Sequence, residues 1–171
     1  MIVITGAAGF IGSVVAGSLN QIGREDLVLV DDFSKKIKER NFRNKKCQLF
    51  LERERLHEWL KDNHSKVDFI VHLGARTDTT EFDWNVFAEL NVNYTERLWT
   101  LCAEYSIPLI YASSAATYGG GEFGYDDSHQ VVDKLVPLNP YGRSKNEIDK
   151  WILSQEKFPP FWAGLKFFNV Y

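Results

Sequence analysis

The stretch "IVITGAAGFIG" (residues 2–12) decides the fold of this 171-residue chain. A run of β-branched residues leads into three glycines with the spacing Gly6-x-x-Gly9-x-x-Gly12, and an apolar segment with helical character follows at once. Glycines at this spacing permit a tight turn and let backbone N–H groups approach a pyrophosphate, and the helix N-terminus favours its negative charge. The stretch therefore predicts a strand, a phosphate-binding loop and a helix.

Asp31 ends the next predicted strand, nineteen residues after Gly12. A carboxylate at this position accepts hydrogen bonds from the adenosine ribose hydroxyls, which favours NAD over NADP. The basic residues that follow could instead meet the 2′-phosphate of NADP, or they could be solvated charges on a loop. These residues are Lys35, Lys36, Lys38 and Arg40. The sequence thus predicts a nicotinamide dinucleotide and leaves the choice between NAD and NADP open.

Short apolar runs alternate with helical stretches along the rest of the chain. Strands are expected at 2–6, 27–32, 47–51, 68–75, 108–114 and 163–169, and helices at 10–22, 52–62, 85–105 and 141–156. Crossovers between successive strands predict a parallel sheet with helices on both faces, a doubly wound Rossmann-type α/β fold over residues 1–171. Two long connections, the basic 34–46 and the Gly-rich, acidic 119–140, have lengths typical of functional or disordered loops.

Composition narrows the class of partner. The net charge is only −3 with both signs interspersed, so the sequence shows no electrostatic footprint for nucleic acid or an anionic membrane. No transmembrane span is predicted. Cys47 and Cys102 lie in apolar stretches and indicate neither a disulfide framework nor a metal site, which fits a reducing cytoplasm. A small-molecule partner is expected.

Three polar residues form the predicted catalytic group. Tyr141 and Lys145 are four residues apart on a predicted helix, and Ser114 ends a strand whose carboxyl end lies at the same sheet edge as the glycine loop. A nearby ammonium favours the phenolate, so Lys145 is expected to lower the pKa of Tyr141 and make it a general base. The Ser114 hydroxyl would hold a substrate alcohol or carbonyl. An isolated Tyr-x-x-x-Lys is usually an ordinary helix pair, but here the glycine loop and Asp31 accompany it.

Over essentially its whole length the chain resembles the extended short-chain dehydrogenase/reductase superfamily of nucleotide-sugar epimerases and dehydratases. Dehydratases of the superfamily that this chain resembles carry an Asp-Glu pair where this chain has Ala115 and Ala116, so dehydration is not expected. Four longer segments resemble the ADP-L-glycero-D-manno-heptose 6-epimerase family, which makes the heptose precursor of the lipopolysaccharide inner core. They are "ARTDTTEFD" (75–83), "YASSAATYGGGEFGYDD" (111–127), "PLNPYGRSK" (137–145) and "FFNVY" (167–171).

The resemblance implies a set of site residues. Cofactor contacts are expected at Gly6, Gly9, Phe10, Ile11, Gly12, Asp31, Asp32, Lys38, Arg53, Leu73, Gly74, Ala75, Arg76, Thr77, Asn91, Tyr141 and Lys145. Ser114, Tyr141 and Lys145 would be catalytic, and Ser114 and Asn169 would contact the substrate. The family usually uses NADP, with NAD as the alternative. Leu73 and Arg53 depart from the family, which often has glutamate and lysine there.

The implied reaction inverts C6″ of ADP-glycero-manno-heptose by transient oxidation and re-reduction with one bound cofactor. The resemblance places a second acid/base lysine and a C-terminal substrate domain beyond Tyr171, so we expect an N-terminal portion of a cytoplasmic enzyme that is a homo-oligomer at full length. One alternative is another nucleotide-sugar 4-epimerase. A second is a non-catalytic dinucleotide-sensing module, although a sensor has no need for an activated phenol.

Overall fold

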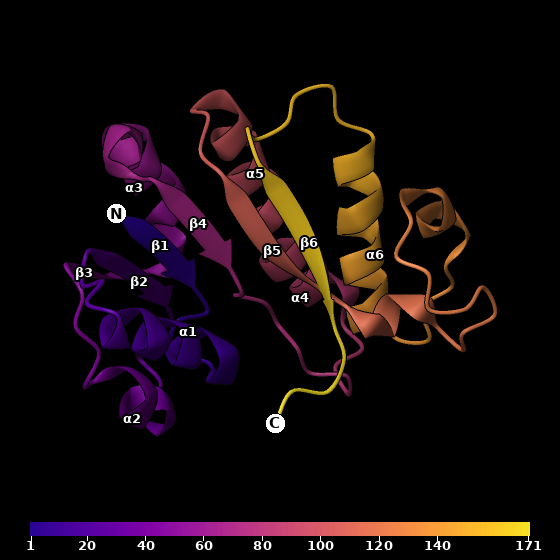
Figure 1. Cartoon of the computed structure of the whole chain (residues 1–171). Coiled ribbons are helices and arrows are strands. Elements are labelled where there is room, and N and C mark those ends of the chain that lie inside the picture. Colours follow the sequence, from indigo (N-terminus) through magenta and orange to yellow (C-terminus); the bar gives the residue numbers. More distant parts are fainter.

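The computed structural model describes residues 1–171 and contains one six-stranded sheet of order β3-β2-β1-β4-β5-β6 (Figure 1). Its strands are β1 (Ile2–Thr5), β2 (Leu27–Asp31), β3 (Leu49–Glu52), β4 (Phe69–His72), β5 (Leu109–Ser114) and β6 (Trp162–Phe167). All neighbouring strands are parallel. The strand order reverses between β1 and β4, and ligands of such sheets bind outside the carboxyl ends of the strands at that point. The predicted Rossmann-type fold is confirmed.

The helices connect these strands. The α-helices are α1 (Phe10–Gln21), α2 (Glu39–Phe42), α3 (Leu56–Asn63), α4 (Trp84–Phe87), α5 (Tyr94–Glu104) and α6 (Pro140–Leu153). Short 3₁₀ helices are η1 (Lys36–Lys38), η2 (Arg53–Arg55), η3 (His64–Lys66), η5 (Ala115–Tyr118) and η6 (His129–Lys134). The helix expected over 85–105 is interrupted by the π-helix η4 (Ala88–Asn93), and the last helix ends at Leu153, short of the expected residue 156.

Alternate residues of the central strands enter two separate cores. Val3 and Val28 belong to a larger cluster that includes Leu98 of α5, whereas Ile4 and Leu29 pack in a smaller cluster with residues of α1. All five residues of β2 are buried, as expected for a parallel strand covered on both faces. The alternation of strand side chains therefore fixes which helices cover which face.

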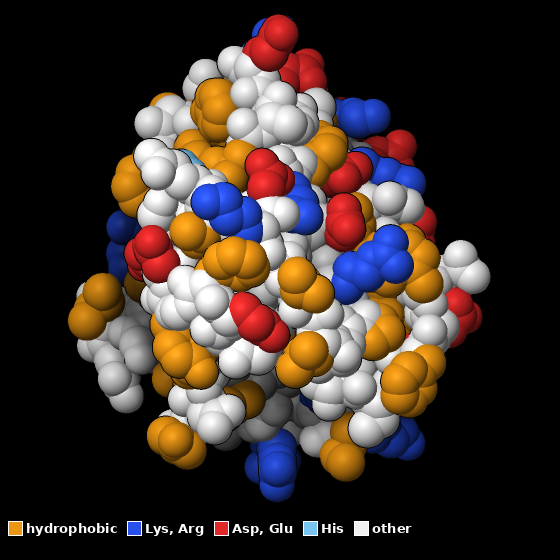
Figure 2. Space-filling view, turned by 90° about the vertical axis from the view of Figure 1, so that its right-hand side faces the viewer, with side chains coloured by type: hydrophobic (Ala, Val, Ile, Leu, Met, Phe, Trp, Pro, Cys, Tyr) orange, Lys and Arg blue, Asp and Glu red, His pale blue; other side chains and the backbone are white.

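The two faces are covered unequally. Figure 1 shows α1 and α2 over one face at the β1–β3 side, with α3, α5 and α6 over the other face. On the α1 face no helix covers β5 and β6, and Leu165 of β6 is 40% exposed. Figure 2 shows acidic, basic and apolar side chains interspersed over the face that carries α6 and the long connection. None of the helices combines the length and the hydropathy that a membrane-spanning helix requires.

Candidate functional site

The glycine loop packs directly against the end of β4. Gly6 has φ +68°, a left-handed conformation that favours glycine, and a Cβ there would lie 2.7 Å from the backbone N of Gly74. A Cβ on Gly12 would overlap the carbonyl oxygen of Gly6. Gly9 differs, because its φ is −78° and an added Cβ would have only the Gly6 oxygen nearby, at 3.1 Å. The fold thus needs Gly6 and Gly12, whereas the absence of a side chain at Gly9 mainly leaves space beside the loop.

A cavity of about 570 Å³ opens beside this loop, at the carboxyl ends of β1, β2 and β4. Its volume lies within the usual range for small-molecule and cofactor sites. Predicted cofactor residues that line it are Gly6, Gly9, Phe10, Ile11, Gly12, Asp31, Lys38, Arg53, Leu73, Gly74, Ala75, Arg76 and Thr77. The cradle of backbone N–H groups, the acid at the end of β2 and the basic side chains fit a dinucleotide with its two phosphates.

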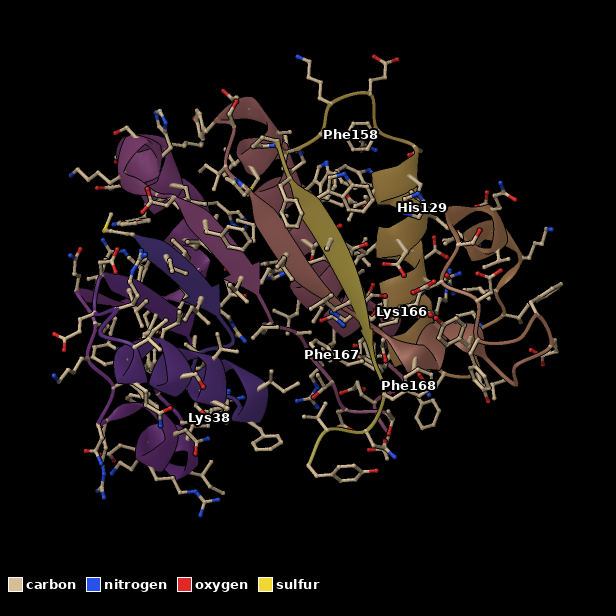
Figure 3. The ribbon with its side chains drawn as sticks, in the orientation of Figure 1. Lys38, His129, Phe158, Lys166, Phe167 and Phe168 are labelled. Atoms are coloured by element: carbon tan, nitrogen blue, oxygen red, sulfur yellow. The ribbon has the colours of Figure 1, made fainter.

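Asp31 ties the second strand to the glycine loop. Its side chain is nearly buried, and its Oδ2 accepts a hydrogen bond from the N–H of Ala8 at 2.9 Å. Its Oδ1 accepts from the N–H of Asp32 at 2.8 Å and from Nζ of Lys38 at 2.9 Å. The Asp31–Lys38 ion pair therefore places an anion and a cation together on the cavity wall, and Figure 3 shows Lys38 beside α1.

A buried hydrogen-bond chain fixes the opposite wall. Oγ1 of Thr5 accepts from the N–H of Gly74 at 3.0 Å and lies 2.6 Å from Nδ1 of His72, whose Nε2 is 2.9 Å from Oγ1 of Thr95. Burial, aided by the positive charge of Lys145, lowers the pKa of His72 to about 3. His72 is therefore neutral at neutral pH and joins β1, β4 and α5 beneath the loop.

Asn91 holds the segment after β4 rather than the cavity itself. It is fully buried in the π-helix; its Oδ1 accepts from the N–H of Arg76 at 2.7 Å, and its Nδ2 donates to the carbonyl of Arg76 at 3.0 Å and to Oγ of Ser144 at 2.9 Å. Asn91 thus links the cavity wall to α6. A direct contact between Asn91 and the cofactor stays a prediction.

The start of α6 is built to bring Tyr141 close to the end of β5. Oδ1 of Asn139 accepts from the N–H of Gly142 at 2.7 Å, and Pro140 occupies the first turn, both common at helix N-termini. A Cβ on Gly142 would lie 2.7 Å from the carbonyl oxygen of Ala116 in η5. Only glycine allows this approach, which carries Tyr141 toward Ser114.

Ser114 and Lys145 complete the group. Oγ of Ser114 accepts from the N–H of Ala116 at 3.1 Å, which leaves the hydroxyl proton free to donate. Lys145 is almost fully buried, and its Nζ donates to the carbonyl of Ala112 at 2.7 Å, two residues before Ser114 on β5. The structure therefore gathers Ser114, Tyr141 and Lys145 around the carboxyl end of one strand.

The pKa values of this group differ from the expectation. Burial raises the pKa of Tyr141, and hydrogen bonding with Ser114 opposes that rise. Burial lowers the pKa of Lys145 to about 8, and the negative charge of Asp149 opposes that fall. The expectation that Lys145 lowers the pKa of Tyr141 is wrong for this structure, because the ammonium donates to the Ala112 carbonyl instead. Helical spacing placed the two residues on one face but did not determine where the long lysine side chain points.

Some predicted contacts lie away from the cavity, and some of its walls were missed. Asp32, Asn91, Tyr141 and Lys145 do not line it, and Asn169 is exposed beyond β6. Lys35, which was considered as a phosphate contact, does line it, and the missed wall residues are Thr5, Val30, Asp78, Leu90 and Tyr94. Leu90 and Tyr94 are four residues apart in the stretch expected to form the helix over 85–105, and apolar spacing alone does not separate a core face from a cavity wall; Tyr94 both packs against the main core and lines the cavity.

The comparisons with known proteins agree with this geometry. Residues 2–171 match the NAD dependent epimerase/dehydratase family. The chain belongs to this family. It is 45% identical over 175 residues to an ADP-L-glycero-D-manno-heptose-6-epimerase of Fusobacterium nucleatum and 40% identical over 173 residues to one of Nitratidesulfovibrio vulgaris. Each alignment covers 100% of this chain and 53% of the relative, so the chain spans about half the length of these curated relatives.

Two solved structures are similar over 99% of the chain and 55% of their own length. The Helicobacter pylori ADP-L-glycero-D-manno-heptose-6-epimerase superposes with a TM-score of 0.80 at 29% identity. MoeE5, solved in complex with UDP-glucuronic acid and NAD, superposes with a TM-score of 0.73 at 26% identity.

Proposed function

We propose that the full-length protein is an ADP-L-glycero-D-manno-heptose 6-epimerase. The observation that carries the proposal is the grouping of Ser114, Tyr141 and Lys145 at the end of β5, beside a cavity that fits a dinucleotide. The 45% identity to an enzyme of that name supports the choice of sugar nucleotide. Ser114, Tyr141 and Lys145 alone would also suit other nucleotide-sugar epimerases, so the identity of the sugar is proposed from the relatives.

The residues of this chain would act as follows. The Ser114 hydroxyl, anchored by the Ala116 N–H, would hold the C6″ oxygen, and Tyr141 would accept its proton as that carbon becomes a ketone. Lys145 would brace the end of β5, where its ammonium donates to the Ala112 carbonyl two residues before Ser114. A dinucleotide held by the glycine loop and the wall around Asp31 would supply reversible hydride transfer at C6″, with the hydride returned to the opposite face, so that no net oxidant would be consumed. The proton would return to the oxygen from an acid on the face to which the hydride returns.

NADP is the proposed cofactor, with NAD as the alternative. Lys35, Lys38 and Arg53 line the cavity near Asp31, and such cations suit a 2′-phosphate. Asp31 itself favours a free ribose hydroxyl, but its carboxylate is already engaged by Lys38 and two backbone N–H groups. A 2′-phosphate could accept from Lys38 in place of that carboxylate.

The proposal is tested by supplying the full-length protein with ADP-D-glycero-D-manno-heptose and following C6″ by NMR. Tyr141→Phe keeps the ring but removes the proton acceptor, so turnover should fall by about 10²–10⁴ while cofactor binding survives. Tyr125→Phe is the matched control, because Tyr125 is an exposed tyrosine outside this group. UDP-glucose is assayed in parallel. Turnover of UDP-glucose alone would indicate a 4-epimerase, and cofactor binding without turnover of either sugar would indicate a sensing module.

A further inference from the structure

A buried ion pair joins α6, one turn beyond Lys145, to strand β6. The carboxylate of Asp149 is 2.9 Å from Nζ of Lys166, and the two side chains are only 5% and 11% exposed. Figure 3 shows Lys166 extending from β6 toward α6. The proposed chemistry assigns neither residue a role. A buried pair is seldom a net source of stability, because desolvation of both charges offsets their attraction. Its presence beside the site therefore calls for another explanation.

Two strands orient the carboxylate of Asp149. Its Oδ1 accepts from the hydroxyl of Tyr111 at 2.9 Å, and its Oδ2 accepts from Oγ of Ser113 at 2.7 Å in addition to Lys166. A group that accepts from three donors behaves as an ionised carboxylate. The negative charge is thus held in one place against the buried face of α6.

The other end of the pair reaches the catalytic serine. Nζ of Lys166 also donates to Oγ1 of Thr117 at 2.7 Å, and the Thr117 hydroxyl donates to the carbonyl of Ser114 at 2.8 Å. In the β5–β6 register, Lys166 pairs with Ser113. The ion pair is therefore linked through Thr117 to the backbone of Ser114, and it lies on the α6 side of the sheet, as Lys145 does.

Lys145 has few groups that keep it charged. Its ammonium is buried, and its one hydrogen bond goes to the neutral carbonyl of Ala112. Burial of an ammonium favours the neutral amine, whereas a nearby carboxylate favours the charged form. The other titratable groups near Lys145 and Asp149 are His72 of β4, Tyr111 of β5, Tyr118 of η5, Tyr141 of α6 and Lys166 of β6. The histidine is neutral and burial raises the pKa of each of these tyrosines, so Asp149 is the anion of the group.

We propose that Asp149 is a positioning residue that keeps Lys145 protonated, and that Lys166 holds the carboxylate in place and limits its effect on Lys145. With its proton, Lys145 makes a charge-assisted hydrogen bond to the Ala112 carbonyl beside the proposed catalytic group; without the proton, that positive charge is lost. The turnover part of this inference rests on the proposed function. The charge state of Lys145 does not depend on which sugar the enzyme takes.

Removing the charge of Asp149 and removing the charge of Lys166 should shift the pKa of Lys145 in opposite directions. Asp149→Asn removes the negative charge, so the pKa of Lys145 should fall by about one unit or more. The alkaline limb of the pH–turnover profile should then move to lower pH. Lys166→Met removes a competing positive charge, so the same limb should move to higher pH. A purely structural pair would give two variants with lower activity and the same limb.

The first measurement is the pH profile of turnover in the full-length protein. The second is an NMR titration of Lys145, followed by the ¹³Cε chemical shift of labelled lysine. The Lys145→Met variant assigns the Lys145 signal, because that signal is missing from its spectrum. Glu147→Gln is the control, because Glu147 is a solvent-facing carboxylate on the same helix, and no shift is expected. Opposite shifts for Asp149→Asn and Lys166→Met support the proposal. Unchanged titration in both, or shifts of the same sign, overturn it.

Two further outcomes are also decisive. If Asp149→Asn does not fold, Lys166→Met decides alone, and an unshifted lysine in that variant overturns the proposal. If the wild-type protein turns over no sugar nucleotide, the proposed function fails, and the NMR titration still tests the ion pair. The two failures are therefore distinguishable.

Discussion

Gly142→Ala tests how closely α6 must approach η5. In the structure the added Cβ would lie 2.7 Å from the Ala116 carbonyl oxygen, whereas ordinary contacts begin at 3.4 Å, so the helix start must move by about 0.7 Å. Such overpacking costs about 1–3 kcal/mol of the free energy of unfolding. A displacement of about 1 Å at a catalytic group can cost 10²-fold, so we expect kcat to fall by about 10- to 100-fold. Cofactor affinity should stay within about twofold, since Gly142 does not line the cavity.

Helix propensity alone predicts the opposite sign for Gly142→Ala, because alanine inside a helix is favoured over glycine by about 1 kcal/mol. Urea unfolding and steady-state turnover of the full-length protein therefore separate the two explanations. Glu147→Ala, at an exposed position of the same helix, controls for a general effect of mutating α6. A Gly142→Ala variant that is more stable than wild type and fully active would refute the close-approach argument.

Three other outcomes are expected. Gly9→Ala should weaken both NAD and NADP by about 1.4 kcal/mol or more, a tenfold loss in calorimetry, because Gly9 lines the cavity, and it should cost less stability than Gly142→Ala, because its Cβ would lie 3.1 Å from the Gly6 oxygen; unchanged affinity would remove the loop from the binding site. Lys38→Ala should lower NADP affinity more than NAD affinity, by about 1.5–3 kcal/mol; equal losses would leave Lys38 only as the partner of Asp31. His72 should destabilise the fold in acid, because its folded pKa of about 3 lies below the unfolded value of 6.5: stability is complete above pH 6.5 and falls by about 1.4 kcal/mol per pH unit toward pH 3. Urea unfolding across that range should show a weaker pH dependence in His72→Gln, and identical slopes would contradict this assignment.

The sequence predicted those parts of the fold that depend on residues close together in the chain. The glycine spacing of residues 6–12 specified a turn whose close contacts the structure confirms, and short apolar runs located all six strands to within a few residues. The end of α6 was placed too late, because the sequence after Leu153 carries no strong stop signal before Pro159.

Side-chain contacts between residues far apart in the chain could not be predicted from the sequence. The direction of the Lys145 ammonium depends on a carbonyl of β5, and the pairing of Asp149 with Lys166 depends on which strand lies beside β5. Likewise, Tyr94 packs against the main core as its spacing suggests, but its hydroxyl donates to the Arg53 carbonyl and it also lines the cavity. Periodicity shows that a face is apolar, whereas what lies opposite that face is set by tertiary structure.

The most direct test of the central claim is to follow deuterium during epimerisation. The full-length protein is given ADP-D-glycero-D-manno-heptose labelled with deuterium at C6″ in ordinary water, and the product is analysed by NMR and mass spectrometry. If the hydride leaves C6″ and returns within the site, the inverted product keeps its deuterium and the Tyr141→Phe variant forms little product. Inverted product that has exchanged its deuterium for solvent hydrogen would show proton abstraction from carbon and would contradict the account.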